Sequence, residues 1–203
     1  MTRRAVLVFV RAPEAGRVKT RLAAGIGAEA ALRVYRRLAE HAVREALATG
    51  AEVRVHFTPA DRGGEVRAWL GDEVRYFRQP EGDLGERMEA AFDAAFADGA
   101  ERAVIIGSDL PDLSAELLRE AFALLDSRMA VLGPARDGGY YLLGMRAMVP
   151  GVFHGVPWST DAVLARTLER MRDAGAEPAL LATLADVDEA ADLPAGWAEW
   201  ARG

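Results

Sequence analysis

Hydrophobic residues follow two alternating patterns along the chain. Short runs rich in valine and isoleucine, such as residues 5–10 and 103–106, are typical of strands buried inside a sheet. The longer segments between them place hydrophobic residues three or four positions apart, which predicts amphipathic helices. Strands are predicted at 5–10, 52–57, 73–77, 103–106, 129–133, 140–145 and 178–181. Helices are predicted at 28–48, 65–70, 84–97, from Ser114 to residue 125, and from Ser159 or Thr160 to about residue 173.

The alternation of strands and helices predicts an α/β fold in three layers, with a mostly parallel sheet between two layers of helices. One antiparallel element is expected, because a short glycine-rich loop joins the strands 129–133 and 140–145. No linker, repeat or low-complexity tract divides the chain, so residues 1–203 are predicted to form one domain.

Composition narrows the classes of function. Of 203 residues, 25 are Lys or Arg and 31 are Asp or Glu, which gives a net charge of −6. Such a chain is poorly suited to broad binding of nucleic acid or a membrane surface. The absence of cysteine excludes disulfides and thiolate chemistry and agrees with a cytoplasmic location. The apolar run 5–10 is too short for a signal peptide or a membrane span.

Four cations follow the first predicted strand. Arg11, Arg17, Lys19 and Arg21 lie in one loop, whose backbone is shaped by Gly16. Ligands of open parallel sheets bind beyond the carboxyl ends of the strands. Lysine and arginine suit a polyphosphate there, although the loop is not a Walker A sequence. A solvated basic loop is the alternative.

The fourth predicted strand ends in Gly107, Ser108 and Asp109. A carboxylate at a strand tip facing a phosphate-binding loop is a natural anchor for Mg²⁺, which binds one or two carboxylates together with substrate phosphates. Pro111 is expected to stiffen the turn so that Asp109 faces the ligand. For Asp112, capping of the following helix is the favoured interpretation.

Three further loops carry candidate groups. Gly82 and Gly85 would allow a flat ligand such as a base to approach the backbone, although an ordinary helix start explains them equally well. The hairpin between the strands 129–133 and 140–145 offers an acid, and the segment 157–161 could cap a helix, bind an anion or bind metal. The segment 186–192 could supply a second metal carboxylate, or its acids could cap a helix. The candidates in these loops are Arg136, Asp137, Gly138, Gly139, Tyr140, Trp158, Ser159, Thr160, Asp161, Asp186, Asp188 and Asp192.

Six of these stretches together resemble one family. The fragments "FVRAPEAGRVKTRL", "EGDLGERM", "GSDLPDL", "GPARDGGYYLLG", "PWSTD" and "DVDEAADL" occur in this order across nearly the whole chain. They are similar to the DUF2064 family, also described as rSAM/selenodomain-associated transferase 1 and linked by name to arsenosugar biosynthesis. More distantly, "KTRL" and "SDLP" resemble the 2-phospholactate and molybdenum-cofactor guanylyltransferases.

The resemblance implies the GT-A fold of nucleotide-diphospho-sugar transferases, with a nucleotide beyond the first strand and Mg²⁺ or Mn²⁺ on Asp109. Asp188 and Asp161 are the further expected metal ligands. In "DVDEAADL", Glu189 to Ala191 replace the Thr-Pro-Glu that relatives often carry, which makes that turn less rigid.

Three functions compete at this point. The first is nucleotidyl transfer from a nucleoside triphosphate to a small phosphorylated acceptor, with Lys19, Asp109 and Asp137 as catalytic residues. The second is glycosyl transfer from a nucleotide-sugar, in which Asp137 or Asp161 would be the acceptor base. The third is nucleotide binding without turnover. The oligomeric state is not predicted.

Overall fold

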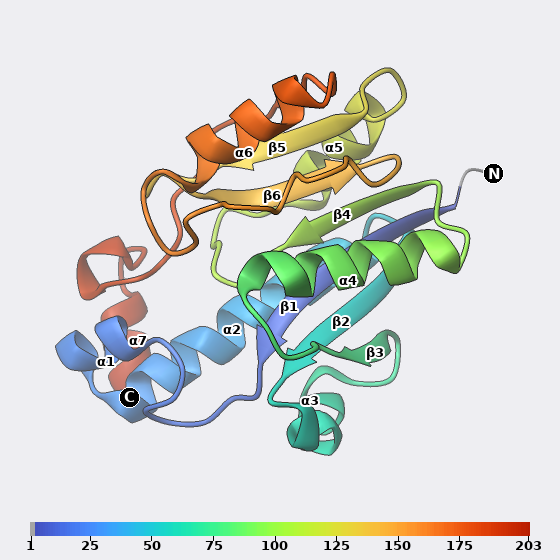
Figure 1. Cartoon of the computed structure of the whole chain (residues 1–203). Helices are drawn as coiled ribbons and strands as arrows, with labels where there is room; N and C mark the ends of the chain where they lie inside the picture. The colour runs from blue at the N-terminus through green and yellow to red at the C-terminus, as the bar shows by residue number, and fades with distance from the viewer. Residues whose placement is uncertain (1–2) are drawn as a thin grey trace.

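Seven strands form one mixed sheet in this computed structural model, which describes residues 3–203 (Figure 1). The strands are β1 (Arg4–Arg11), β2 (Glu52–Thr58), β3 (Arg75–Arg78), β4 (Arg102–Ile106), β5 (Ala130–Pro134), β6 (Tyr140–Met145) and β7 (Ala179–Leu180). Their order is β3-β2-β1-β4-β6-β5-β7. β6 runs antiparallel to β4 and β5, and the other pairs are parallel. The predicted sheet with one antiparallel element is therefore confirmed.

Helices cover both faces of the sheet, which confirms the predicted three layers. They are α1 (Thr20–Ile26), α2 (Ala28–Leu47), α3 (Gly63–Leu70), α4 (Leu84–Ala97), α5 (Ala115–Leu124), α6 (Val163–Asp173) and α7 (Trp197–Arg202), with short 3₁₀ turns at Ala60–Arg62 and Ala190–Asp192. α4 and α6 lie on one face, and α2, α3 and α5 lie on the other (Figure 1). No helix of residues 3–203 combines the length and hydrophobicity that crossing a bilayer requires.

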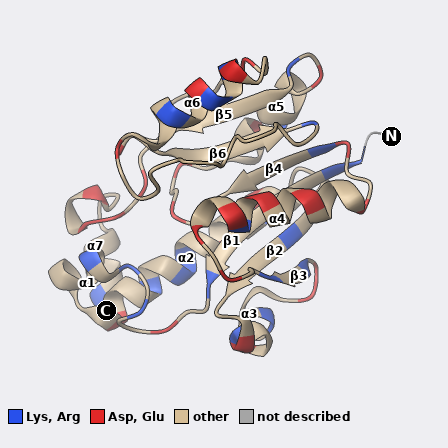
Figure 2. Cartoon of the chain, in the orientation of Figure 1, with Lys and Arg blue, Asp and Glu red and all other residues tan. Residues whose placement is uncertain are grey.

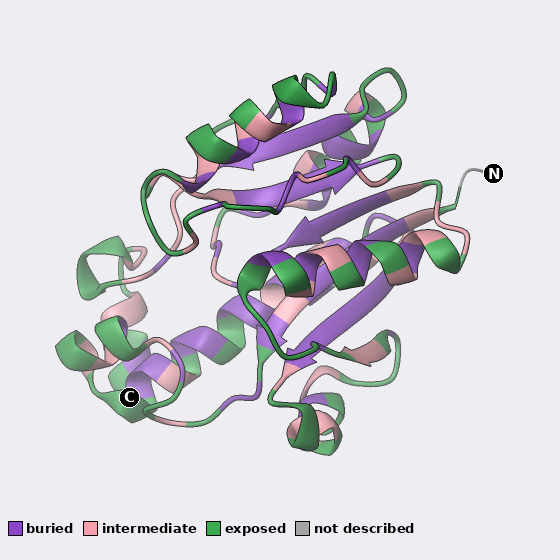
Figure 3. Ribbon diagram, viewed as in Figure 1, coloured by how far each residue is buried: buried purple, intermediate pink, exposed green. Residues whose placement is uncertain are grey.

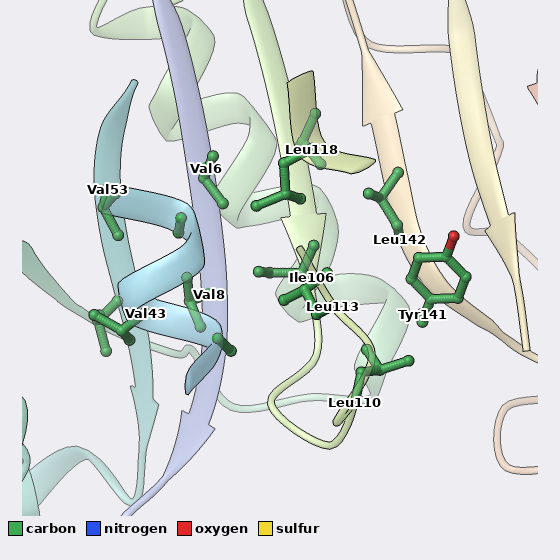
Figure 4. Close-up of a cluster of buried hydrophobic side chains, with 14 of the residues drawn as sticks. Val6, Val8, Val43, Val53, Ile106, Leu110, Leu113, Leu118, Tyr141 and Leu142 are labelled. Atoms are coloured by element: carbon green, nitrogen blue, oxygen red, sulfur yellow. The ribbon is translucent and has the colours of Figure 1, made fainter. Parts of the chain in front are cut away.

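The strands β1, β2, β4, β5 and β6 are buried along most of their length, whereas the edge strands β3 and β7 are not (Figure 3). On one face, Val6 and Val8 of β1 meet Val43 of α2 and Leu118 of α5 in a continuous apolar cluster (Figure 4). A second cluster on the other face packs α4 and α6 against the sheet. Burial on both faces explains why the strands read as uninterrupted hydrophobic runs.

Local signals place the ends of two helices as the sequence predicts. α4 begins with a capping box, in which Asp83 and Glu86 each accept a hydrogen bond from the other's backbone N–H. The Ser114 hydroxyl accepts from the N–H of Leu117 and caps α5. The capping role favoured for Asp112 is therefore wrong.

The predicted start of α6 is also wrong. The helix begins at Val163, and its N-cap position is Ala162, which provides no side-chain cap. The Thr160 hydroxyl instead donates to the carbonyl of Pro157 and stabilises the turn that precedes the helix. Ser159 has a φ of 65°, outside the helical region.

The C-terminal segment packs back on the N-terminal half of the chain. α7 joins α1 and α2 in a third apolar cluster that contains Ala201 and Leu22. The guanidinium of Arg37 lies 4.3 Å from the ring centroid of Trp197 and 4.5 Å from that of Trp200. α1 itself has seven residues and was too short to be predicted from periodicity.

A buried cation lies near the start of β2, away from the carboxyl edge of the sheet. Arg54 is 1% exposed, and its Nη2 donates to Glu52 Oε2 at 3.1 Å. Its Nη1 lies 2.9 Å from Asp98 Oδ2. Arg75 on β3 also contacts both acids. Two cations and two carboxylates therefore neutralise one another there.

Two residues farther along β2, His56 stacks between aromatic rings of the neighbouring strands. Its ring centroid lies 5.4 Å from that of Phe9 and 5.2 Å from that of Phe77. Burial, with a smaller contribution from the charge of Arg54, lowers the pKa of His56 to about 4. The imidazole is neutral at physiological pH.

Candidate functional site

Two adjoining pockets open at the carboxyl edge of the sheet. The larger has a volume of about 540 Å³ and the smaller of about 330 Å³. Three residues, Arg21, Asp109 and Asp188, line both pockets. This position, beyond the ends of parallel strands, is where open α/β sheets bind ligands.

The smaller pocket gathers the four cations of the loop after β1, as the sequence predicts. Ser108 and Asp109 face the same space. The side chain of Arg17 is largely exposed, and that of Lys19 is only 6% exposed. The residues that line the pocket are Arg11, Arg17, Val18, Lys19, Thr20, Arg21, Tyr35, Ser108, Asp109 and Asp188.

Lys19 is bound directly to the carboxylate at the tip of β4. Its Nζ lies 2.8 Å from Asp109 Oδ2. Lys19 precedes α1 in the left-handed backbone conformation, with a φ of 48°, and its carbonyl accepts from the N–H of Ala23. A non-glycine residue there stores strain, which is common at functional sites. The backbone thus directs this cation at Asp109.

Tyr35 of α2 fixes the backbone where the basic loop begins. Its hydroxyl donates to the carbonyl of Arg11 at 2.8 Å and accepts from the N–H of Arg11 at 2.7 Å. Burial raises the pKa of the Tyr35 phenol. The sequence gives no local sign of this role, because the place of Tyr35 on the inward face of α2 is typical of an ordinary core residue.

Asp109 is held by the turn after β4. The Ser108 hydroxyl donates to Asp109 Oδ1 at 3.3 Å, and the side chains of Leu110 and Leu113 anchor the turn in the core. The Asp109 side chain remains 40% exposed. Its carbonyl accepts from the N–H of Val187 at 3.0 Å, which holds the segment 186–188 beside it.

The two acids of that segment have different surroundings. Asp188 Oδ2 lies 2.5 Å from Arg21 Nη1, and this contact raises the pKa of the guanidinium. Asp186 lines the larger pocket, where burial and then the charges of Asp137 and Asp109 raise the pKa of its carboxyl. Asp186 therefore belongs to the same group of carboxylates as Asp109.

The larger pocket combines apolar walls with an acidic lining. Phe9, Leu84, Met88, Tyr140 and Trp158 contribute to its walls. Acidic residues also lie on the exposed side of α4 (Figure 2). The charged residues that line the pocket are Arg21, Asp109, Asp137, Asp161, Asp186 and Asp188.

The hairpin between β5 and β6 positions Asp137 beside the loop that precedes α6. Asp137 Oδ1 accepts from the N–H of Gly139 at 2.9 Å. Gly138 has a φ of 88°, and a Cβ added there would lie 2.3 Å from the carbonyl oxygen of Asp161. Only glycine allows this close approach, which brings Asp137 and Asp161 to the same side of the pocket.

The side chains of Trp158 and Tyr140 form one wall of the larger pocket and lie against α4. A Cβ added at Gly85 would lie 2.7 Å from Cζ2 of Trp158, so this glycine makes room for the indole. The Tyr140 hydroxyl lies 4.0 Å from the sulfur of Met88, and burial raises the pKa of the phenol. At Gly82, which has a φ of 125°, an added Cβ would meet Glu86 of the capping box.

The structure brings most of the predicted site residues together. Those that line at least one of the two pockets are Arg11, Arg17, Lys19, Arg21, Ser108, Asp109, Asp137, Gly139, Tyr140, Trp158, Ser159, Thr160, Asp161, Asp186 and Asp188. Those that line neither pocket are Gly16, Gly82, Gly85, Arg136, Gly138 and Asp192.

The donor set fits a magnesium ion bound together with phosphates. Within residues 3–203, no three acidic or histidine side chains converge closely enough to hold a metal ion by themselves. Mg²⁺ does not require such a cluster, because it keeps water ligands and binds phosphate oxygens with one or two carboxylates. Asp109 and Asp186 are such carboxylates beside a cationic pocket. Asp188, the expected second ligand, lines both pockets and is paired with Arg21, as Asp109 is paired with Lys19, so the expectation for Asp188 stays a prediction.

Comparison with known proteins identifies the family. The model of the family described as "Uncharacterized protein conserved in bacteria (DUF2064)" matches residues 42–160. This chain belongs to the DUF2064 family. The match contains Asp109 and Asp137, whereas the basic loop and Asp186 of this DUF2064 protein lie outside it. No curated protein matches the sequence.

Solved structures support the assignment and the fold. A protein from Desulfovibrio desulfuricans G20, provisionally assigned as a nucleotide-diphospho-sugar transferase, is 39% identical, with a TM-score of 0.89 over 93% of this chain and 84% of its own.

Two more distant neighbours share the fold alone. CMP:2-keto-3-deoxy-manno-octonic acid synthetase, in complex with CTP, is 14% identical, with a TM-score of 0.60 and 99% of each chain covered. Inositol-1-phosphate CTP transferase from T. maritima is 18% identical, with a TM-score of 0.59 and coverage of 98% of this chain and 95% of its own. The DUF2064 chain thus has the fold of nucleotide-diphospho-sugar transferases, as predicted.

Proposed function

We propose that this protein is a Mg²⁺-dependent nucleotidyltransferase, which transfers a nucleotidyl group from a nucleoside triphosphate to a small acceptor. The observation that carries the proposal is the pair of adjoining pockets, one cationic and one acidic and aromatic, that meet at Asp109. A donor and an acceptor would then lie on either side of one carboxylate. That the acceptor is phosphorylated remains a prediction.

The cationic pocket suits the triphosphate. Arginines there can bind phosphate oxygens in a bidentate manner, and Lys19 supplies a compact charge at the junction. The bonds from Tyr35 hold the start of the loop in one conformation before a ligand arrives. Catalysis by positioning and charge needs such a preorganised arrangement and no covalent intermediate on the protein.

The junction between the pockets suits the reacting phosphate. A magnesium ion bound there would neutralise charge on the phosphates. Asp109 and Asp186 would hold that ion, and Lys19 would then turn from Asp109 toward the phosphates. Asp137, which lines the larger pocket, would accept the proton of an attacking hydroxyl. The cytoplasmic location stays a prediction, with which the absence of cysteine is compatible.

Glycosyl transfer is the second candidate. The name of the relative from Desulfovibrio desulfuricans G20 favours it, and the larger pocket has room for a sugar next to Asp137 and Asp161. The cationic pocket would then hold the diphosphate of a nucleotide-sugar as the leaving group. Nucleotidyl transfer is preferred, because one loop supplies four cations to the phosphate pocket, two of which, Lys19 and Arg21, are paired with Asp109 and Asp188.

Calorimetric titration separates the candidates. The common nucleoside triphosphates and their nucleotide-sugars are titrated into the protein, each with and without Mg²⁺. We expect one triphosphate to bind at least about tenfold more tightly with Mg²⁺ than without it. Preference for a nucleotide-sugar would favour glycosyl transfer. Binding without turnover in the presence of acceptors would favour a nucleotide-binding protein, and binding of no nucleotide would refute all three functions.

A further inference from the structure

The two pockets differ in the charge that they offer to a ligand. The smaller is lined by four cations and two carboxylates, whereas the larger is lined by five carboxylates and one cation, Arg21. Asp188 holds that one cation in an ion pair. The larger pocket is therefore a poor site for an anionic group, even though the smaller pocket beside it suits phosphate.

A magnesium ion at the junction does not remove this difference. If Asp109 and Asp186 hold the ion, the carboxylates of Asp137 and Asp161 remain to face the acceptor. Asp137 is fixed by the hydrogen bond from Gly139, and the backbone of Asp161 is fixed by its close approach to Gly138. Both acids are exposed at the pocket, so their two charges would together weaken binding of a phosphate monoester by about tenfold.

The remaining walls indicate what the acceptor contains instead. Leu84 is 46% exposed beside the pocket, and the rings of Phe9, Tyr140 and Trp158 line it. Apolar and aromatic walls with a few fixed polar groups are typical of sites that bind small organic molecules. Carboxylates among those walls accept hydrogen bonds from hydroxyl and ammonium groups.

We infer that the acceptor is a small molecule without a phosphate group, which has an apolar or ring-shaped part and presents hydroxyl or protonated amine groups to Asp137 and Asp161. This inference rests on the proposed function, because it takes the larger pocket as the acceptor site. It replaces the phosphorylated acceptor expected from the sequence with a neutral or cationic one.

Matched probes test this charge preference. Benzylamine, benzyl alcohol and benzyl phosphate share one ring and differ in the group that would meet the acids. Each is titrated by ligand-observed NMR into the protein, once with Mg²⁺ and the triphosphate found by calorimetry, and once without nucleotide. We expect benzylamine to bind at least about tenfold more tightly than benzyl phosphate, with benzyl alcohol between them.

Variants show whether the two acids cause the preference. Asp137→Asn with Asp161→Asn keeps the side-chain oxygen that Gly139 needs, and we expect it to reduce the preference for benzylamine to about twofold or less. Asp173→Asn removes one exposed carboxylate from the far end of α6 and is expected to leave the preference unchanged. Circular dichroism and thermal unfolding confirm that each variant is folded.

Three results would overturn the inference. They are benzyl phosphate binding as tightly as benzylamine, an unchanged preference in the double variant, and no binding of any probe up to about 10 mM. Even fragment-sized ligands bind a suitable pocket more tightly than that concentration. The proposed function fails separately, when no triphosphate shows Mg²⁺-dependent binding. Because the probes are also measured without nucleotide, a failure of this inference can be told apart from a failure of the proposed function.

Discussion

Two buried cations of this protein are held by carboxylates in different ways. Arg54 is a residue of strand β2. Glu52 and Asp98 lie beside its guanidinium, and Arg75 belongs to the same cluster. Lys19 contacts Asp109, on a strained backbone at the junction of two pockets. A cation that several groups neutralise on a regular strand serves the fold. A cation that has one ion-pair partner and lines a pocket can exchange that partner for a ligand.

The sharpest contrast is expected at Asp109. Asp109→Asn keeps an oxygen for Lys19 but removes the charge that would hold Mg²⁺, so release of pyrophosphate should fall by roughly 100- to 1,000-fold. The melting temperature should stay within about 2 °C of the parent, because the side chain is partly solvated. Asp98→Asn is the matched control for activity. Undiminished turnover in Asp109→Asn would remove this residue from the reaction.

The reverse result is expected in the Arg54 cluster. Glu52→Gln with Asp98→Asn leaves a guanidinium that is 1% exposed without a neutralising charge. The free energy of unfolding should fall by about 2 to 4 kcal/mol, measured with urea, while the affinity for the Mg²⁺–nucleotide complex stays unchanged. A double variant as stable as the parent, or one that loses nucleotide binding, would contradict the structural role of this cluster.

His56, two residues beyond Arg54 on β2, makes the stability of this part of the fold depend on pH. Its pKa of about 4 in the folded protein lies below the value near 6.5 of an unfolded chain, so the folded state binds fewer protons in acid. Its contribution to stability is complete above pH 6.5 and declines as the pH falls toward 4. Between pH 7.5 and 5, the loss should be about 2 kcal/mol.

The variant His56→Phe keeps a ring between Phe9 and Phe77 but does not titrate. Urea unfolding at both pH values should therefore show a smaller loss in this variant, by the contribution of the imidazole. Equal losses in the two proteins would show that other groups cause the acid sensitivity.

The smallest effect is expected at Lys19. Lys19→Met keeps an apolar stem for the buried part of the side chain and removes the charge, which should weaken triphosphate binding by about tenfold. Calorimetry with the tri-, di- and monophosphate of one nucleoside should show a loss that decreases with the number of phosphates. Arg166→Met on α6 is the control for loss of a surface cation. Equal losses for all three nucleotides would place Lys19 away from the phosphates.

The sequence predicted the parts of the site that depend on strand order. Asp109 follows a buried run, and the basic loop follows another, so a parallel sheet brings them to one edge. The ion pair between Lys19 and Asp109 could not be predicted, because it depends on the left-handed conformation of Lys19 and on α1, which is too short for a periodic signal.

The choice between Asp186 and Asp188 shows a second limit. Both carboxylates lie in one extended segment, two residues apart, and either could face Asp109. Two contacts give Asp186 and Asp188 different surroundings. Arg21 pairs with Asp188, and the N–H of Val187 between them donates to the carbonyl of Asp109. These contacts join residues more than 70 positions apart, so no local pattern encodes them.

The reversed direction of β6 also affects how molecules enter and leave. A parallel strand after β5 would need a crossover of a dozen or more residues, whereas the antiparallel one is reached by residues 135–139. On this side, the larger pocket is bordered by a short turn locked against the loop before α6. This border is therefore expected to keep one shape while molecules enter and leave the pocket.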